Sequence, residues 1–170
     1  GGGLVPASFY QAVALDETVV RIAGNTPDGH GNVFTTGVVF ALDTQTETWS
    51  QLPNVLFPRY VFSAGAINGD IHIAGGAVWP GGLRTRTTER FDGTTWTMQA
   101  QIPEPNSLEW AFCASTVVDQ RLLMFGNGWG QTIAYSPDDN SWTPSNLMPQ
   151  LNVQRAYAGG VTLDGQAYCL

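Results

Sequence analysis

Short runs of alternating apolar and polar residues dominate the chain, and turn residues separate them. The stretch "INGDIHIAGG" (67–76) is typical, because a turn at Asn68-Gly69 leads into an alternating segment that stops at Gly75-Gly76. Alternation with a period of two predicts a β-strand, and Asn-Gly between two such runs predicts a tight hairpin. The pattern therefore predicts an antiparallel, hairpin-rich protein.

The same pattern returns at a nearly constant interval. The segments "RIAGN", "HIAGG" and "LMFGN" place Ile22, Ile73 and Met124 at equal steps of 51 residues. A second marker, a tryptophan after a polar turn, recurs at Trp49, Trp96 and Trp142. In the second repeat we expect four strands, at about 60–66, 70–75, 86–92 and 95–100. Four short antiparallel strands every 45–50 residues are typical of a β-propeller blade.

The fold class expected from this period is all-β, a β-propeller segment of about three blades plus part of a fourth. The blades are expected at about 8–52, 59–100, 110–144 and, incompletely, 155–170. Glycines suit the crowded zone near the propeller axis, where the chain turns sharply and the next blade approaches. Tryptophans on the outermost strands suit the rim, where neighbouring sheets splay apart and a large ring fills the gap.

Several of these segments resemble kelch repeats. The resemblance lies in "AGG" (74–76), "ERFDGTTW" (89–96), "AYSPDDNSW" (134–142) and "PRY" (58–60), and it extends over essentially the whole chain. It implies a kelch-type β-propeller. Asn25 stands where the family has its second glycine, and because asparagine tolerates left-handed backbone geometry we expect the turn to form there as well.

The fourth repeat has room for two strands only. An exposed strand edge and blade face would result, so we expect either further blades on a longer polypeptide, which we favour, or packing of copies against one another.

Composition narrows the classes of partner. Only 12% of the residues are charged, every basic residue is an arginine, and the net charge is −7, which argues against nucleic acid. No apolar run is long enough to cross a bilayer and no signal-like segment opens the sequence, so we expect a soluble protein with no membrane partner and leave its compartment open. Cys113 and Cys169 are interpreted as buried thiols or one disulfide.

The loops between the second and third strands of each repeat are the candidate binding region, because variable loops on a rigid scaffold usually carry recognition. They cover 25–34, 76–86 and 127–131, and include Asp28 and His30. The candidate binding residues on this side are Arg59, Trp79, Arg84, Arg86, Trp129 and Arg155. Arginine and tryptophan favour an acidic or carboxylate-bearing ligand on a protein or carbohydrate partner, and this function needs no cofactor.

Structural interpretations of some of these residues stay open. Arg59 and Arg155 could equally bond backbone carbonyls of the adjacent blade. His72 is interpreted as a strand residue with a hydrogen-bonded ring, and Asp138-Asp139 as a turn pair.

The alternative function is enzymatic. Cys113 and Tyr157 lie on the innermost strands of successive repeats, an arrangement similar to that of galactose oxidase and its relatives. That resemblance implies a thioether between the two residues beside a copper ion. Copper also needs imidazole ligands, and His30 and His72 both precede the pair, so further ligands would have to lie beyond Leu170.

Overall fold

The computed structural model describes residues 9–27, 33–103, 110–125, 130–154 and 157–170, and these form an almost entirely β structure. The described helical structure is one short 3₁₀ turn, η2 (Ser145–Leu147). Within these ranges no helix has the length and apolarity that a bilayer crossing would need.

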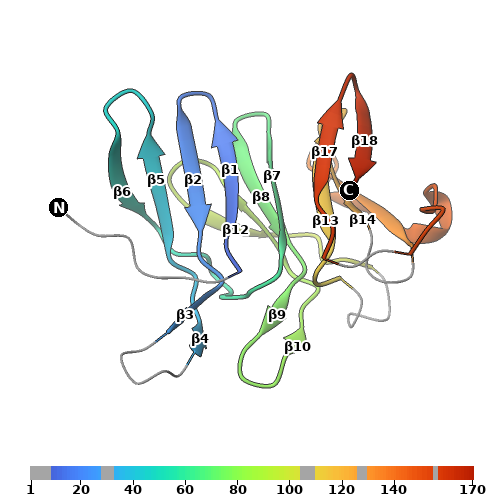
Figure 1. Ribbon diagram of the computed structural model, residues 1–170, viewed down its shortest axis with the longest axis horizontal. Helices are drawn as coiled ribbons and strands as arrows, with labels where there is room; N and C mark the ends of the chain where they lie inside the picture. The colour runs from blue at the N-terminus through green and yellow to red at the C-terminus, as the bar shows by residue number, and fades with distance from the viewer. Residues whose placement is uncertain (1–8, 28–32, 104–109, 126–129, 155–156) are drawn as a thin grey trace.

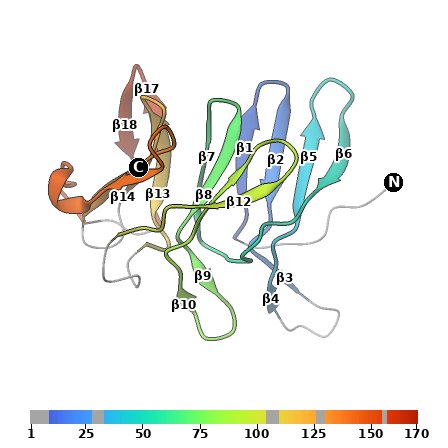
Figure 2. The same cartoon turned by 180° about the vertical axis from the view of Figure 1, so that it is seen from behind.

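Three four-stranded antiparallel sheets and one two-stranded sheet follow one another along the chain (Figures 1 and 2). The first blade contains β1 (Gln11–Leu15), β2 (Thr18–Ile22), β5 (Val39–Asp43) and β6 (Thr48–Leu52). The second contains β7 (Ser63–Ile67), β8 (Asp70–Ala74), β11 (Thr88–Phe91) and β12 (Trp96–Gln99). The third contains β13 (Ala114–Val118), β14 (Arg121–Phe125), β15 (Thr132–Ser136) and β16 (Ser141–Thr143). The last sheet pairs β17 (Gly160–Leu163) with β18 (Gln166–Cys169).

The turns between first and second strands form where the sequence places them. Asn68 and Gly69 have φ values of 53° and 85°, and Asp164 and Gly165 have values of 50° and 73°. Positive φ at both central residues matches the right-handed twist of the flanking strands, which explains the Asn-Gly and Asp-Gly pairs. These hairpin tips lie together along one side of the molecule, at the top of Figure 1, and we call this side the turn face.

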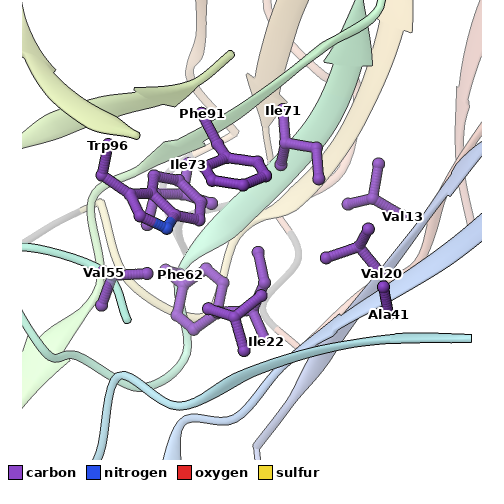
Figure 3. Packing of buried hydrophobic residues seen from close by; sticks show 11 residues of the cluster. Val13, Val20, Ile22, Ala41, Val55, Phe62, Ile71, Ile73, Phe91 and Trp96 are labelled. Carbon is purple, nitrogen blue, oxygen red and sulfur yellow. The ribbon is translucent and has the colours of Figure 1, made fainter. Parts of the chain in front are cut away.

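The first strand of every blade lies innermost, as expected for a propeller. β1 packs beside β7, β7 beside β13, and β13 beside β17. Between the sheets, apolar side chains of consecutive blades interlock. Figure 3 shows one such layer, in which Val13, Val20 and Ile22 of the first blade meet Ile71, Ile73 and Trp96 of the second.

The glycine pair ends β8 for the reason inferred from the sequence. Gly75 and Gly76 have φ values of 65° and 97°, which L-residues rarely adopt. A Cβ on Gly75 would overlap the carbonyl oxygen of Trp110 in the next blade, and the amide of Gly76 donates to that same oxygen at 2.8 Å. Bare backbone is therefore needed both for the bend and for the approach of the next blade. The first blade differs at the corresponding position. Asn25 does not have a positive φ, so the expected left-handed turn is absent there, and Asn25 begins a strand.

The tryptophans of the fourth strands fill the outer gaps between blades. Trp96 is buried and its indole N–H donates to the carbonyl of Pro53 at 2.9 Å, at the exit of the preceding blade. Trp142 is also buried and donates to the carbonyl of Ala100 at 2.9 Å. Trp49 belongs to the first described blade and remains 37% exposed. The role of this position is thus to seal a blade against the blade before it.

The connections between second and third strands differ from the irregular loops expected. Two of them fold into short hairpins that project from the side opposite the turn face, at the bottom of Figure 1. The first arm pairs β3 (Asn25–Pro27) with β4 (Val33–Thr35), and the second arm pairs β9 (Ala77–Val78) with β10 (Leu83–Arg84). We call this side the arm face. The amide of Trp79 donates to Oγ1 of Thr35 at 2.6 Å, so the two arms are tied together.

Candidate binding face

The second arm presents the most exposed of the predicted binding residues. Trp79 is 48% exposed and Leu83, on the opposite strand of the arm, is 73% exposed. Arg84 follows on β10 and is half-buried. The short β9–β10 ladder holds an indole, an isobutyl group and a guanidinium on one small projection, a mixture typical of protein-binding surfaces.

A cavity of about 220 Å³ opens at the hub, where the chain enters the innermost strands. Rings dominate its walls. Its lining residues are Phe9, Tyr10, Gln11, Val61, Phe62, Phe112, Cys113, Tyr157 and Ala158. The cavity is therefore shared by all four blades. Cys113 and Tyr157, the pair predicted from the sequence for the copper alternative, both line it.

The entrance of this cavity is formed by a backbone conformation that is repeated in each blade. Phe9, Val61, Phe112 and Tyr157 each have φ between 51° and 60°, a region that bulky residues rarely adopt, and each lies just before the innermost strand of its blade. The amide of Phe112 donates to the carbonyl of Val61, and the amide of Tyr157 to the carbonyl of Phe112, both at 3.1 Å. These hydrogen bonds connect the second, third and fourth blades around the axis. The available signal in the sequence was positional, since the four residues occupy corresponding places in the repeats.

Arg84 connects the second arm with the hub. Its guanidinium carbon lies 5.2 Å from the centre of the Phe112 ring, a cation–π geometry, and Phe112 in turn packs on Tyr157 with ring centres 4.5 Å apart. Among the described residues no carboxylate forms a salt bridge with Arg84. A positive charge therefore stands beside an aromatic cavity without an internal counter-ion in the described part of the chain.

Arg86, unlike Arg84, uses its guanidinium for a hydrogen bond within the protein. Its Nε donates to the carbonyl of Ile102, and the amide of Ile102 donates back to the carbonyl of Arg86 at 3.0 Å. The side chain thus anchors the segment that leaves the second blade. It remains half-buried at the base of the second arm.

Arg59 is not accessible to a partner, which corrects its place among the binding residues. Its side chain is fully buried, forms an ion pair with Glu89, and donates to the carbonyls of Phe57 and Thr87 at 2.9 and 2.7 Å. The bonded carbonyls belong to its own blade and to the segment leading into it, rather than to the adjacent blade. Burial lowers the pKa of Arg59 to about 10, and the Glu89 carboxylate opposes that change. Glu89 also accepts the amides of Leu56 and Phe57, so this ion pair fixes the segment that enters the second blade.

Two predicted binding residues, Trp129 and Arg155, lie outside the described residues, as do Asp28 and His30 of the first arm loop. Their contribution to the arm face stays a prediction.

The structure brings Cys113 and Tyr157 to the same cavity, where both are lining residues. Burial raises the pKa of the Cys113 thiol to about 12, whereas the nearby Arg84 charge acts to lower it. Neither Cys113 nor Cys169 forms a disulfide in the described structure. Within the described residues no group of three histidine, cysteine or carboxylate side chains is placed to hold a metal ion. The copper-radical alternative therefore stays a prediction from the sequence.

His72 is a buried strand residue, but its ring is not hydrogen-bonded as expected. Neither ring nitrogen has a partner among the described atoms, and the ring packs on Tyr135 of the next blade with centres 5.5 Å apart. Burial lowers the pKa of His72 to about 4. The residue lies far from the arm face, near the turn that begins β8.

Carboxylates gather on the turn face. Those placed at its hairpin turns are Asp16, Glu17, Asp43, Glu47, Asp70, Asp92, Asp119, Asp138, Asp139 and Asp164. At three of them local hydrogen bonds lower the carboxyl pKa. The donors are Thr95 and Thr94 for Asp92, the Thr46 and Gln45 amides for Asp43, and the Ser136 and Ser141 side chains for Asp139. Asp138 and Asp139 lie in the turn between β15 and β16, as interpreted from the sequence. Among the described residues the carboxylates are thus concentrated away from Arg84.

Comparison with known proteins agrees with this architecture. An F-box/kelch-repeat protein of Arabidopsis thaliana is 28% identical over 138 residues, covering 81% of this chain and 49% of the relative. The F-box protein AFR of the same plant is 28% identical over 123 residues, covering 67% of this chain and 31% of AFR. The chain thus spans about half, or less, of the length of these relatives.

Two further comparisons concern the fold. No family model matches the chain. The solved structure of YjhT, a kelch-type propeller, superimposes with a TM-score of 0.74 at 15% identity, covering 98% of this chain and 58% of YjhT. Together with the repeated four-stranded blades, the hub glycines and the rim tryptophans, these similarities support a kelch-type β-propeller fold, with three blades and part of a fourth in this chain.

Proposed function

We propose that the chain is a protein-interaction scaffold that binds its partner on the arm face, at the mouth of the hub. The observation that carries this proposal is the position of Arg84, whose cation lies over Phe112 at the rim of the aromatic cavity. Support also comes from the similarity to an F-box/kelch-repeat protein, because this type of protein implies a protein-interaction scaffold.

The chemistry of this region defines the partner. A carboxylate would pair with Arg84, and an adjacent apolar or aromatic side chain would enter the cavity between Phe9, Val61 and Tyr157. The exposed Trp79 and Leu83 would cover the bound segment from the second arm. We therefore propose a protein segment in which an acidic residue neighbours an apolar one.

A peptide-display selection tests this proposal. Random peptides are selected on the wild-type chain and counted again on a Trp79→Ala/Arg84→Ala variant and on a turn-face control, Glu17→Ala/Asp138→Ala, at two exposed residues without positive φ. We expect enriched peptides to carry Asp or Glu beside an apolar residue and to lose binding to the arm-face variant only. Thermal unfolding should be nearly equal for all three proteins, because none of the four replaced side chains is buried in the core between blades. Enrichment that survives on the arm-face variant, or that disappears on the turn-face control, would place the binding site elsewhere.

A further inference from the structure

The second arm has one strand edge in use and one open. On the β9 side, Tyr60 and Ala77 exchange two backbone hydrogen bonds, at 2.8 and 2.9 Å, in an isolated bridge. On the other side, β10 pairs with β9 alone among the described strands. β10 therefore forms the outer edge of the arm, on the side away from the first arm (Figures 1 and 2).

Hydrogen-bond alternation shows which groups the β10 edge offers. Because Ala77 directs its amide and carbonyl toward Tyr60, its pair with Arg84 on β10 is of the non-bonded kind. The next residue agrees, since the amide of Thr85 donates to the carbonyl of Gly76 at 2.9 Å. The amide and carbonyl of Arg84 consequently point outward, and they have no backbone partner on that side among the described residues.

The side chain of Arg84 adds a positive charge to this edge. Its guanidinium lies over the Phe112 ring and forms no salt bridge with a carboxylate of the described residues. In an antiparallel pair, two residues that exchange both backbone bonds lie directly opposite each other, with their side chains on the same face. A residue bonded to the backbone of Arg84 would therefore place its side chain beside the guanidinium. Charge complementarity favours an aspartate or glutamate at that position.

The neighbours of that acidic residue would meet apolar groups. Side chains alternate along a strand, so the residues on either side of the acid would lie on the face of Leu83, which is 73% exposed. The residues two positions away return to the Arg84 face, where the Phe112 ring lines the hub cavity. The β10 edge thus favours an extended segment in which the acid lies among apolar and aromatic residues.

We propose that an extended acidic segment of the partner pairs antiparallel with β10. Its acidic residue exchanges both backbone hydrogen bonds with Arg84, and its carboxylate pairs with the guanidinium of the same residue. This inference rests on the proposed function and adds to it the conformation and register of the bound segment.

General recognition chemistry and the arm itself both support this mode of binding. When a strand is added to an exposed edge, main-chain hydrogen bonds give affinity and alternate side chains give specificity. The opposite edge of the same arm already holds one such pair of bonds, between Tyr60 and Ala77. Arg84 offers the equivalent pair on β10, together with a charge that selects the residue opposite it.

A peptide with a modified backbone tests the proposal. The probe is the capped heptapeptide SFVDVFS, whose central aspartate is designed to lie opposite Arg84. N-methylation of that aspartate removes the donor to the Arg84 carbonyl, and a matched control carries N-methyl groups on both valines, whose amides point away from β10. We expect calorimetric affinity to fall by about tenfold or more for the first peptide, and the control to bind within about threefold of the unmodified probe.

Amide exchange gives a second readout, on the protein. Saturating SFVDVFS should slow exchange of the outward Arg84 amide by about tenfold or more, while the Leu83 amide, which points toward β9, stays within about twofold.

Four results would each overturn the proposal: no binding of SFVDVFS, no greater weakening by the methylated aspartate than by the methylated valines, binding without protection of the Arg84 amide, or an Arg84 amide as protected as that of Leu83 before peptide is added. The last result would show that the edge is already occupied. The proposed function fails by a different result, namely selected peptides that bind the Trp79→Ala/Arg84→Ala variant as well as the wild type. Peptides that lose binding to this variant, together with any of the four results, would leave binding at the arm face without strand pairing.

Discussion

At the scale of single residues, the backbone of the adjacent blade limits which side chains fit near the propeller axis. Gly75 is in contact with a backbone carbonyl of the third blade, whereas Gly69, at the tip of a turn, has nothing within 4 Å of an added Cβ. Both have positive φ. Comparing the two separates the cost of the backbone conformation from the cost of crowding between blades.

Gly75→Ala should therefore destabilise the fold far more than Gly69→Ala. We expect a loss of about 1 kcal/mol for Gly69→Ala, from left-handed strain alone, and about 3 kcal/mol or more for Gly75→Ala, which adds overlap with the Trp110 carbonyl. Urea unfolding measures both free energies. Equal losses would show that the blades do not meet at Gly75.

His72 makes stability depend on pH. Its neighbours are Asp70 and Arg90 from its own blade and Tyr135 and Asp138 from the next. Because burial lowers its pKa from an ordinary 6.5 to about 4, the unfolded chain binds a proton first as the pH falls. Stability from the neutral ring is complete above about pH 6.5 and is lost as the pH falls toward 4.

The His72→Phe variant keeps a ring on Tyr135 but cannot titrate. Free energies of unfolding of the two proteins, measured from pH 7.5 to 4.5, should show the wild type losing more stability than the variant across this range. All carboxylates titrate in both proteins, so the difference isolates His72. A difference that does not change with pH would mean that the ring is solvated or hydrogen-bonded in the folded state.

At the scale of elements, the strands and hairpins follow from local patterns, whereas the arms do not. Turn pairs such as Asn68-Gly69 specify the first hairpin of a blade, since their φ preferences are local. The β3–β4 arm is held in part by the contact between Thr35 and Trp79, 44 residues apart. Pairing that depends on distant contacts cannot be read from a local window.

The candidate site was predictable only in part. Trp79 and Arg84 were identified because their loop is long and rich in recognition residues, and they lie on an exposed arm. Arg59 was misassigned because its partner Glu89 is 30 residues away on another strand, and sequence alone does not show that the two side chains meet. The hub cavity was not predicted as a binding site, because Phe9, Val61 and Phe112 are residue types that rarely adopt left-handed geometry. Tyr157 was predicted only as part of the copper alternative.

The fourth strands provide a test at this scale. Trp96 is 6% exposed and seals the second blade against the first, whereas Trp49 is 37% exposed. Trp96→Ala should cost about 3–5 kcal/mol and Trp49→Ala about 1 kcal/mol, since only the first leaves a cavity and an unpaired Pro53 carbonyl. Thermal and urea unfolding compare the two variants. Similar costs would argue that the indoles stabilise their own strands and not the junction between blades.

At the scale of the whole molecule, the two faces differ in chemistry. The hairpin turns lie along one face and the two projecting arms along the other (Figure 1). The turn face carries most of the described carboxylates, and the arm face carries Arg84 and the aromatic hub. A partner with a carboxylate would be repelled by the first face and attracted to the second. The propeller thus serves to hold the arm and the hub in a fixed relation.

The most direct test of binding at the arm face is a calorimetric titration of one selected acidic peptide against wild type, Arg84→Ala and the turn-face control Glu17→Ala. Loss of a charge-assisted contact should weaken binding to Arg84→Ala by about tenfold or more, equivalent to about 1.4 kcal/mol, while the control binds within about twofold of wild type. Unchanged affinity for Arg84→Ala, together with altered affinity for the turn-face control, would contradict the proposal that the partner binds on the arm face.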